Sequence, residues 1–472
     1  MLLISHAFPP VSTIGSLRWE KLTAYAATRG WQVDVLMSDP AQADVRDDSR
    51  LNNLPPGIRL FGVHYYSYQE SSIEARLRQW MARALKRLRS SDGADAIPAA
   101  VVPGSQSVTS NGAGRHVSPG RAILAVRRAQ LARRSYAEWE DWAERAAAMG
   151  IALSSQTPYE VVVSSGPPHQ AHLAARTVAD ATGVPYALDF RDPWAHETYI
   201  HPDVRSPAWT RLSAYYERRA VSRASLIVMN TALAERLMRE RYPEMEERIV
   251  TAMNGADPDL RIPGRWGSTF VISYAGQIYG GRDPRPMFRG VRRAIDELGI
   301  APGDLEVRFM GAECLDDIPL TAVASECGLD GYFVSEPLQV RSAALALLQR
   351  SAMAVVLPQQ YQHSIPGKVF EYVQAETWVL SLAERESATD LLLRDAGADC
   401  VAPDDSEGIS RVVSRRYRDF RAGKRPRPLN ADGRFDRLRQ AEPMFDAIDR
   451  VVATARDGAR PRRFSSLIER LG

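Results

Sequence analysis

The feature that most constrains the fold is a repeated alternation of short apolar runs with segments of helical periodicity. Runs such as Leu2–Ser5, Val161–Ser165 and Leu226–Met229 are apolar throughout or nearly so, and turn residues bound them. Such runs are typical of strands buried on both faces, as in a parallel sheet. Helical patterns such as Leu17–Ala27 lie between them, so the chain reads as a series of βαβ units. We therefore predict an α/β protein with doubly wound sheets.

The alternation stops once and then resumes, which divides the chain. After Asn254, prolines and glycines become frequent over 257–268, as in an interdomain linker. We predict a Rossmann-like domain over 1–256, a second over 268–425, and a helical segment over 426–472 that packs back on the first domain. Open α/β sheets bind ligands at the carboxyl ends of their strands, so a cleft between the two domains is the expected ligand site.

Composition excludes several classes of protein. Among 472 residues, 60 are Lys or Arg and 57 are Asp or Glu, and a net charge of +3 gives no sign of a nucleic-acid binder. The three cysteines are widely spaced and form neither a disulfide framework nor a zinc motif. No run of about 18 apolar residues is present, and MLLISHAFPP reads as a buried strand rather than a signal peptide. We expect a cytoplasmic protein.

One long insertion interrupts the first half. Residues 64–156 separate two strands, far more chain than a crossover needs. A basic amphipathic helix is predicted over 73–89. Residues 121–134 are again helical and basic, and 136–149 continue as a helix. Residues 73–134 hold twelve Lys or Arg and three acidic residues, a net charge of +9. Three interpretations are open: contact with an anionic membrane, packing of the apolar face on the first domain, and contact between two copies of the chain.

The most specific motif is SIPGKVFEY, from Ser364 to Tyr372, which follows an apolar strand over 353–357. A helix is predicted from Pro366 to Gln374, and a helix N-terminus suits a phosphate. Lys368 adds a positive charge, and Glu371 could accept hydrogen bonds from a pair of sugar hydroxyls. The alternative is an ordinary capped helix with a Lys–Glu pair on its surface.

A second motif, AGQIYGGRDP, runs from Ala275 to Pro284 between a strand and a helix. Its glycines allow the backbone to approach an anion, and Arg282 could hold a phosphate with its guanidinium fork. The alternative is a plain βα turn in which Arg282 pairs with Asp283.

Charged residues also end strands in the first half. DFRDPW, from Asp189 to Trp194, follows a predicted strand, and Arg191 or Asp192 could contact a reacting ligand. An Arg–Asp pair that braces the loop is the alternative. His169 and His172 lie three residues apart at a helix start, and two histidines alone are too few for a metal site. We expect no bound metal, and a capping or ligand-binding role for His169.

Together these motifs resemble those of GT-B-fold glycosyltransferases of the family 4 type, in particular bacterial surface-polysaccharide enzymes. The resemblance covers roughly 1–60 and 155–425 and not the basic insertion. It implies retaining transfer of a sugar from a nucleotide-sugar donor, without an essential metal or a cofactor. Six motifs carry it in order: FPP…G…R (Phe8 to Arg18), SSGPP (Ser164 to Pro168), DFRDPW, NGAD (Asn254 to Asp257), AGQIYGGRDP and IPGKVFEY.

The resemblance also implies site residues. Arg282 and Lys368 would stabilise the leaving diphosphate, and Glu371 matches the second Glu of an E-x7-E motif that binds the donor ribose. The resemblance implies a donor site of Gly15, Gly276, Gln277, Arg282, His363, Ser364, Ile365, Pro366, Gly367, Lys368 and Glu371, a catalytic set of Arg282, Lys368, Asp192 and Arg191, and Arg18 and His169 on the acceptor side of the first domain.

Two departures from the family keep other functions open. His363 stands where the first Glu belongs, and Gln277 stands where an Arg is common. A catalytically impaired sugar-nucleotide binding protein is therefore one alternative. A GT-B epimerase, a sucrose-phosphate-like synthase and glycosylation of a small natural product are others. The expected partners are a nucleotide-sugar donor and a glycan, lipid-linked or small-molecule acceptor, with no nucleic acid, and peripheral contact with the inner face of the membrane would involve 73–134.

Overall fold

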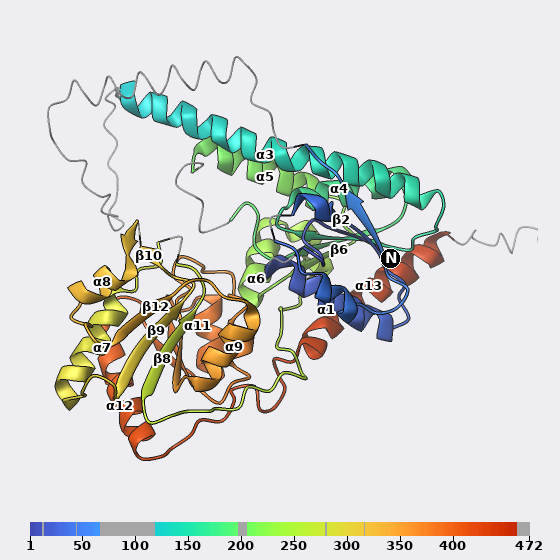
Figure 1. Cartoon of the computed structure of the whole chain (residues 1–472). Coiled ribbons are helices and arrows are strands. Elements are labelled where there is room, and N and C mark those ends of the chain that lie inside the picture. The colour runs from blue at the N-terminus through green and yellow to red at the C-terminus, as the bar shows by residue number, and fades with distance from the viewer. Residues whose placement is uncertain are drawn as a thin grey trace, which may run out of the picture.

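The protein folds into two α/β domains, each built on its own parallel sheet, as a computed structural model shows (Figure 1). The predicted doubly wound α/β class is confirmed. The predicted helix over 73–89 lies outside the described residues. The structure describes residues 1–11, 14–43, 45–66, 119–196, 205–278, 281–315 and 317–459.

The first sheet has seven strands, and every neighbouring pair is parallel. The order reverses between β1 and β4, and the carboxyl ends of the strands on either side of that point are where such sheets bind ligands. The strands, in spatial order, are β3 (Arg59–Val63), β2 (Asp34–Ser38), β1 (Leu2–Ser5), β4 (Val162–Gly166), β5 (Tyr186–Phe190), β6 (Leu226–Met229) and β7 (Ile249–Thr251).

The second sheet has six strands, again all parallel, and a short antiparallel ribbon stands apart from it. The short strands β7 and β15 were not predicted, because three residues are too few to show a periodicity. In spatial order the sheet holds β12 (Phe333–Glu336), β9 (Leu305–Met310), β8 (Phe270–Ala275), β13 (Met353–Val356), β14 (Trp378–Leu382) and β15 (Asp399–Val401), and the ribbon holds β10 (Cys314–Leu315) and β11 (Ile318–Pro319).

Helices cover both sheets and complete the hydrophobic cores. The central strands β1, β6, β13 and β14 are buried along their whole length, which explains their largely apolar sequence. The first domain holds α1 (Ile14–Thr28), α3 (Pro119–Ser154), α4 (Gln170–Thr182), α5 (Pro207–Val221) and α6 (Ala232–Arg241), with 3-10 turns at Pro40–Gln42, Asp48–Asn53 and Pro243–Arg248. The second holds α7 (Arg285–Leu298), α8 (Leu320–Glu326), α9 (Arg341–Arg350), α10 (Val369–Tyr372), α11 (Ala388–Asp395) and α12 (Ser406–Arg421).

The last helix, α13 (Arg437–Ala459), returns to the first domain and packs against α1, β6 and β7 (Figure 1). Its buried residues Met444, Phe445 and Ile448 share a hydrophobic core with Leu3 and Trp19. The chain therefore passes between the two domains twice, once after β7 and once before α13.

Helix α3 contains both stretches predicted to be helical, 121–134 and 136–149. It is one continuous helix of 36 residues that packs against α4 and α5. No proline or glycine stands near Ser135, between the two stretches, to interrupt it. Its second half is fixed by the buried Tyr136 and Trp142, whereas Leu124 and Val126 in its first half are 37% and 49% exposed.

The helix predicted from Pro366 to Gln374 is also shorter than expected. Only Val369–Tyr372 is α-helical, and the residues before it form a tight turn. The N–H groups of Val369 and Phe370 donate to the carbonyls of Pro366 and Gly367 at 3.0 and 3.2 Å. Those N–H groups are consequently engaged within the turn, and four residues sum to only a small dipole.

In the part of the chain that the structure describes, no helix is both long and apolar enough to cross a membrane. Helix α3 is long, but arginines occur throughout its first half.

Candidate functional site

The two domains meet at the carboxyl ends of their strands. Ser364, in the loop after β13, donates a hydrogen bond of 2.6 Å to Asp192 in the loop after β5. Thr231 donates to the main-chain oxygen of His363 at 2.5 Å. These contacts join two of the predicted motifs, DFRDPW and SIPGK, across the domain boundary.

Lys368 is a partly buried cation on the second-domain side of this boundary. Its Nζ donates to the main-chain oxygen of Ala275 at 2.6 Å and lies 4.0 Å from the ring centroid of Tyr274. No carboxylate forms an ion pair with it among the residues that the structure describes. Burial, helped by the nearby charge of Arg282, lowers the pKa of Lys368 to about 7, while Glu371 opposes the shift. Lys368 therefore does not form the surface Lys–Glu pair of the alternative interpretation.

Gly276 makes this arrangement possible. Its φ of +135° is one that side chains rarely adopt, and a Cβ at this position would collide with Nζ of Lys368. The glycine of the AGQ turn is thus required by the close approach of the lysine from the other motif.

Arg282 lies in the same region and is buried. Its guanidinium is 5.0 Å from the ring centroid of Tyr361 and donates to the main-chain oxygen of Gln277 at 3.4 Å. Asp283 instead pairs with Arg285 at 3.3 Å, so the predicted alternative of an Arg282–Asp283 pair is wrong. The side chain of Gln277 is exposed, and only its main chain contributes to the turn.

Glu371 lies on α10 and is held by Arg341 at the start of α9. Arg341 Nε donates to Glu371 Oε1 at 2.6 Å. Its carboxylate is therefore oriented, and it is close enough to Lys368 to act on the pKa of that group. A ligand hydroxyl pair that bound Glu371 would compete with Arg341.

The remaining residues of the SIPGK segment have different surroundings. His363 has a buried Nδ1 with no hydrogen-bond partner, and burial lowers its pKa. Ile365 is buried in the core of the second domain, so it shapes the loop rather than the ligand surface. Gly367 is exposed and Pro366 is half-buried.

Arg18 is part of the framework, which corrects its predicted place on the acceptor side. It is buried and donates to Asp189 at 2.7 and 2.9 Å, and also to Asn254 and to the carbonyl of Ala252. Burial alone would raise the pKa of Asp189, but the charge of Arg18 and hydrogen bonds from Arg18, Trp19 and Ser165 lower it. Asp189, on β5, thus ties α1 and β4 together, and Arg18 extends the link to Ala252, the residue after β7.

Arg191 and Gly15 contact each other at the end of the first sheet. Arg191 donates to the main-chain oxygens of Gly166, at 3.2 Å, and Pro167. A Cβ on Gly15 would collide with the Arg191 guanidinium. Burial lowers the pKa of Arg191, whereas the charges of Asp189 and Asp192 oppose that effect. The structure therefore brings Arg191 and Gly15 together near the carboxyl ends of β5 and β1, the edge of the sheet where a ligand site is expected.

Three histidines gather beside Arg191. His169 stacks on Trp194 with ring centroids 5.1 Å apart, and His172 contacts Ser164 at 2.9 Å. Burial lowers the pKa of His169 well below its ordinary value and that of His172 to about 3. Both are therefore neutral at physiological pH. His169 stands at the N-cap of α4, but within the described residues its side chain makes no capping hydrogen bond.

His6 belongs to the same region and was not singled out from the sequence. Its ring lies edge-on to those of Trp139 and Trp142 of α3, 4.8 and 5.0 Å away. Burial, with the charge of Arg191, lowers its pKa to about 4. The surroundings of His6 include residues of the insertion that lie more than a hundred positions along the chain. A local sequence pattern around His6 does not reveal such contacts.

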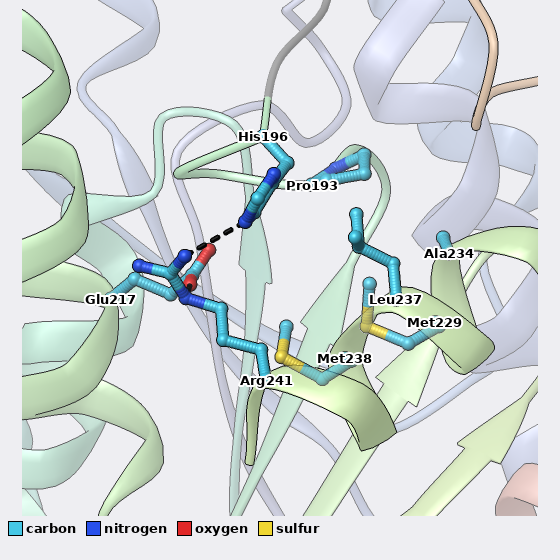
Figure 2. A pocket seen from close by; sticks show the side chains of 8 residues that line it. All are labelled: Pro193, His196, Glu217, Met229, Ala234, Leu237, Met238 and Arg241. Atoms are coloured by element: carbon cyan, nitrogen blue, oxygen red, sulfur yellow. Dashed lines mark hydrogen bonds and ion pairs between the residues drawn. The ribbon is translucent and has the colours of Figure 1, made fainter.

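A small pocket adjoins the loop after β5 (Figure 2). Glu217 and Arg241 pair across it at 2.8 Å, and Arg241 contacts His196 at 2.7 Å, with Met229 and Met238 lining the apolar side. The cavity has room for little more than one water molecule, about 10 Å³, far below the roughly 300–1,000 Å³ typical of small-molecule sites. We do not assign it to donor or acceptor.

Two further residues were missed from the sequence. Gln359, after β13, exchanges hydrogen bonds with the main chain of Asp283 at 2.8 and 3.2 Å and so supports the Arg282 turn. Arg437 at the start of α13 lies within electrostatic range of Glu371, although 66 positions along the chain separate them. In the described ranges, no three His, Cys, Asp or Glu side chains are grouped so as to hold a metal ion.

Comparison with known proteins gives the fold and no closer relative. No protein-family model matches the chain, and no curated protein matches it. Solved structures of similar fold include a sucrose-phosphate synthase from Thermosynechococcus elongatus (TM-score 0.58, 11% identity, 96% of this chain and 99% of that one). A trehalose 6-phosphate synthase from Burkholderia multivorans has a TM-score of 0.54 and 11% identity, over 96% of this chain and 99% of that one. Anabaena HepE in complex with UDP-glucose has a TM-score of 0.51 and 12% identity, over 95% of this chain and 100% of that one. The likeness over nearly the whole chain shows that this protein has the GT-B fold.

Proposed function

We propose that the protein is a glycosyltransferase that moves a sugar from a nucleoside diphosphate sugar to an acceptor hydroxyl. The observation that carries the proposal is the partly buried Lys368, which has no carboxylate partner in the described part of the chain and lies beside Arg282. A diphosphate would supply the negative charge that Lys368 lacks, and the guanidinium of Arg282 is suited to the same group. Both cations lie at the carboxyl ends of β8 and β13, where sheets of this kind bind ligands.

The chemistry follows from this placement. When the bond between the anomeric carbon and the diphosphate oxygen breaks, the electron pair leaves with the diphosphate. Arg282 and Lys368 are held in place before the reaction, so they stabilise that charge without rearranging. The acceptor hydroxyl forms the new bond and loses its proton. We propose retention, by attack on the face from which the diphosphate leaves, which gives the departing oxygen the role of proton acceptor.

The donor is proposed to be a UDP-sugar or a related nucleoside diphosphate sugar. HepE, of similar fold, has been solved with UDP-glucose. In this chain, Glu371 would bind the ribose hydroxyls while Arg282 and Lys368 bind the diphosphate. We propose that neither a cofactor nor a metal is needed, a proposal that activity in the presence of EDTA would test.

We propose a glycan or lipid-linked acceptor on the first domain, near Arg191 and His6. The ring of the half-buried Trp139 and that of the buried Trp142 border this region. Residues 73–134, with their net charge of +9, would hold the protein at an anionic membrane where a lipid-linked acceptor lies. Of this segment, the structure describes 119–134, where Leu124 and Val126 are exposed.

A second candidate is a sugar-nucleotide binding protein without transfer activity. The observation that favours it is His363, a neutral side chain where the family resemblance implies a glutamate. Such a protein would bind the nucleotide through Lys368 and Arg282 and release no nucleoside diphosphate.

The test begins with thermal shifts on a panel of UDP-, GDP- and dTDP-sugars, since ligand binding to the native state raises its stability. Release of nucleoside diphosphate from the best donor is then measured without acceptor. Arg282→Ala should lower the rate of release more than it weakens donor binding, and Arg282→Lys should recover part of the rate. Arg285→Ala is the matched control, because Arg285 lies in the same turn and pairs with Asp283. Binding without release would favour the second candidate, and stabilisation by no donor would contradict both.

A further inference from the structure

Arg437 is a buried arginine at the point where the chain crosses from the second domain back to the first. It opens α13, and its main-chain N–H donates to the oxygen of Ala256 at 2.7 Å. Gly255 permits this approach, because its φ is +68° and a Cβ there would lie 2.5 Å from Cα of Arg437. These backbone contacts with residues 255 and 256 therefore fix the position of the Arg437 Cα, from which the side chain extends.

The side chain of Arg437 has no partner in the part of the chain that the structure describes. The residue is 9% exposed, and its Nε is buried without a hydrogen bond. Burial and the charge of Arg18 lower the pKa of Arg437 to about 10, with Arg341 adding to the effect and Asp257 and Glu371 opposing it. A buried guanidinium remains charged, so the absence of a counter-ion is costly.

The carboxylates near Arg437 are already paired with other cations. Lys21 contacts Asp257 at 3.0 Å, and Arg341 contacts Glu371 at 2.6 Å. Arg18 is likewise paired with Asp189. Among the described residues, the charge of Arg437 is therefore the one that this cluster leaves unbalanced, and a negative charge from outside the protein would balance it.

We propose that Arg437 binds a phosphoryl group that enters between the two domains. The inference rests on the proposed function, which puts a diphosphate beside Lys368 and a ribose on Glu371, within electrostatic range of Arg437. A guanidinium fork suits two oxygens of a phosphoryl group. The positive end of the 23-residue helix α13 begins at the same residue and adds to the attraction. The group is either the donor diphosphate or the phosphate of a phosphorylated acceptor.

The test compares full-length wild type with Arg437→Gln and Arg437→Lys. Arg434→Gln is the matched control, because Arg434 lies three residues earlier and pairs with Asp395 at 2.8 Å. Calorimetry measures binding of UDP, uridine, pyrophosphate and glucose 6-phosphate, and thermal unfolding gives the Tm of each variant without ligand.

We expect Arg437→Gln to weaken binding of UDP and pyrophosphate roughly ten- to a hundredfold, with uridine binding and the ligand-free Tm not lowered. Arg437→Lys should retain part of the affinity, and Arg434→Gln all of it. A loss confined to glucose 6-phosphate would assign the phosphoryl group to the acceptor and still support the site. Unchanged affinity for all three phosphorylated probes would overturn the inference, as would equal weakening of uridine binding with a lower Tm.

These outcomes separate the inference from the proposed function. If wild type binds pyrophosphate or glucose 6-phosphate but not UDP, the proposed nucleotide-sugar donor is contradicted. The Arg437 variants then still test the phosphoryl site with the probe that binds. If wild type binds UDP, and Arg437→Gln binds UDP, pyrophosphate and glucose 6-phosphate as wild type does, the donor is kept and the role of Arg437 is overturned. Wild type that binds none of the phosphorylated probes contradicts both.

Discussion

Arg18 and Asp189 form a fully buried ion pair in which Nη2 lies 2.7 Å from Oδ1 and Nε lies 2.9 Å from Oδ2. They are 171 positions apart, and the pair joins the start of α1 to the end of β5. The indole N–H of Trp19 donates to the same carboxylate at 2.8 Å. Arg18, which was expected to contact a ligand, is thus neutralised by Asp189 inside the first domain.

Arg18→Ala should destabilise the protein by about 3–5 kcal/mol, because it leaves the Asp189 carboxylate buried without its counter-ion. Urea unfolding of the first domain, followed by tryptophan fluorescence, measures the change. Arg46→Ala is the control: that arginine pairs with Asp48 at the surface and should contribute less than about 1 kcal/mol. Equal effects of the two substitutions would contradict the structural role of Arg18.

The same pair predicts a pH dependence. Since the pKa of Asp189 is lowered in the folded protein, its contribution to stability is present above the ordinary pKa of aspartate, about 4. The contribution is lost as pH falls through the folded-state pKa. Wild type and Asp189→Asn should therefore converge in unfolding free energy only in acid, and a constant difference down to pH 2 would argue against it.

The Ser364–Asp192 hydrogen bond should couple the two domains. In a double-mutant cycle with Ser364→Ala and Asp192→Ala, we expect a coupling free energy of about 1 kcal/mol, measured by urea unfolding. Ser155→Ala serves as a control, since its hydroxyl bonds within its own exposed turn. Additive effects of the two substitutions would show that the contact does not hold the domains together.

Lys368 should make nucleotide binding depend on pH. With a pKa of about 7 in the free protein, it loses its proton as pH rises, so UDP affinity should fall between pH 7.5 and 9.5. Lys368→Met should bind weakly at every pH in this range, and Lys368→Arg should show a flatter profile because arginine keeps its charge. Titration calorimetry at fixed ionic strength measures this, and parallel profiles for wild type and Lys368→Arg would exclude Lys368 as the titrating group.

Glu371→Ala should weaken donor binding by about 1.5–3 kcal/mol through loss of hydrogen bonds to the ribose. The Tm should change little, because the Arg341–Glu371 pair is partly exposed. Arg341→Ala is the informative second variant, because it removes the ion-pair partner of Glu371 and keeps the Glu371 carboxylate. Unchanged nucleotide affinity in Glu371→Ala, with normal unfolding, would show that Glu371 does not bind the ribose.

Deletion of the basic insertion tests the membrane proposal. Wild type should co-sediment with phosphatidylglycerol vesicles at low salt and be released at high salt, because each basic residue contributes about 1 kcal/mol near an anionic surface. A variant without 73–118 should remain in the supernatant and keep donor hydrolysis. Equal recovery of wild type with anionic and neutral vesicles at low salt would contradict the proposal.

Much of the fold could be predicted because its signals are local. Strands such as β1, β6 and β13 are buried on both faces, so a short apolar run suffices to locate them. Motifs that follow such strands lie at the carboxyl ends of a parallel sheet, which is why SIPGK and AGQ were assigned to one site before any contact was known. The sequence alone thus determined the α/β class, the two sheets and the region of the site.

What each charged residue does was decided by the tertiary structure. The sequence suggests both Arg18 and Lys368 as candidate ligand contacts. In the structure, Asp189 neutralises Arg18. Within the described residues, Lys368 contacts an aromatic ring and a main-chain carbonyl and no carboxylate. No local sequence pattern marked Arg437. Its position depends on the close approach of Gly255, and its electrostatic surroundings depend on charged residues of both domains. Pairing and burial arise between residues far apart in the chain, and a local pattern contains no information on which carboxylate reaches which cation.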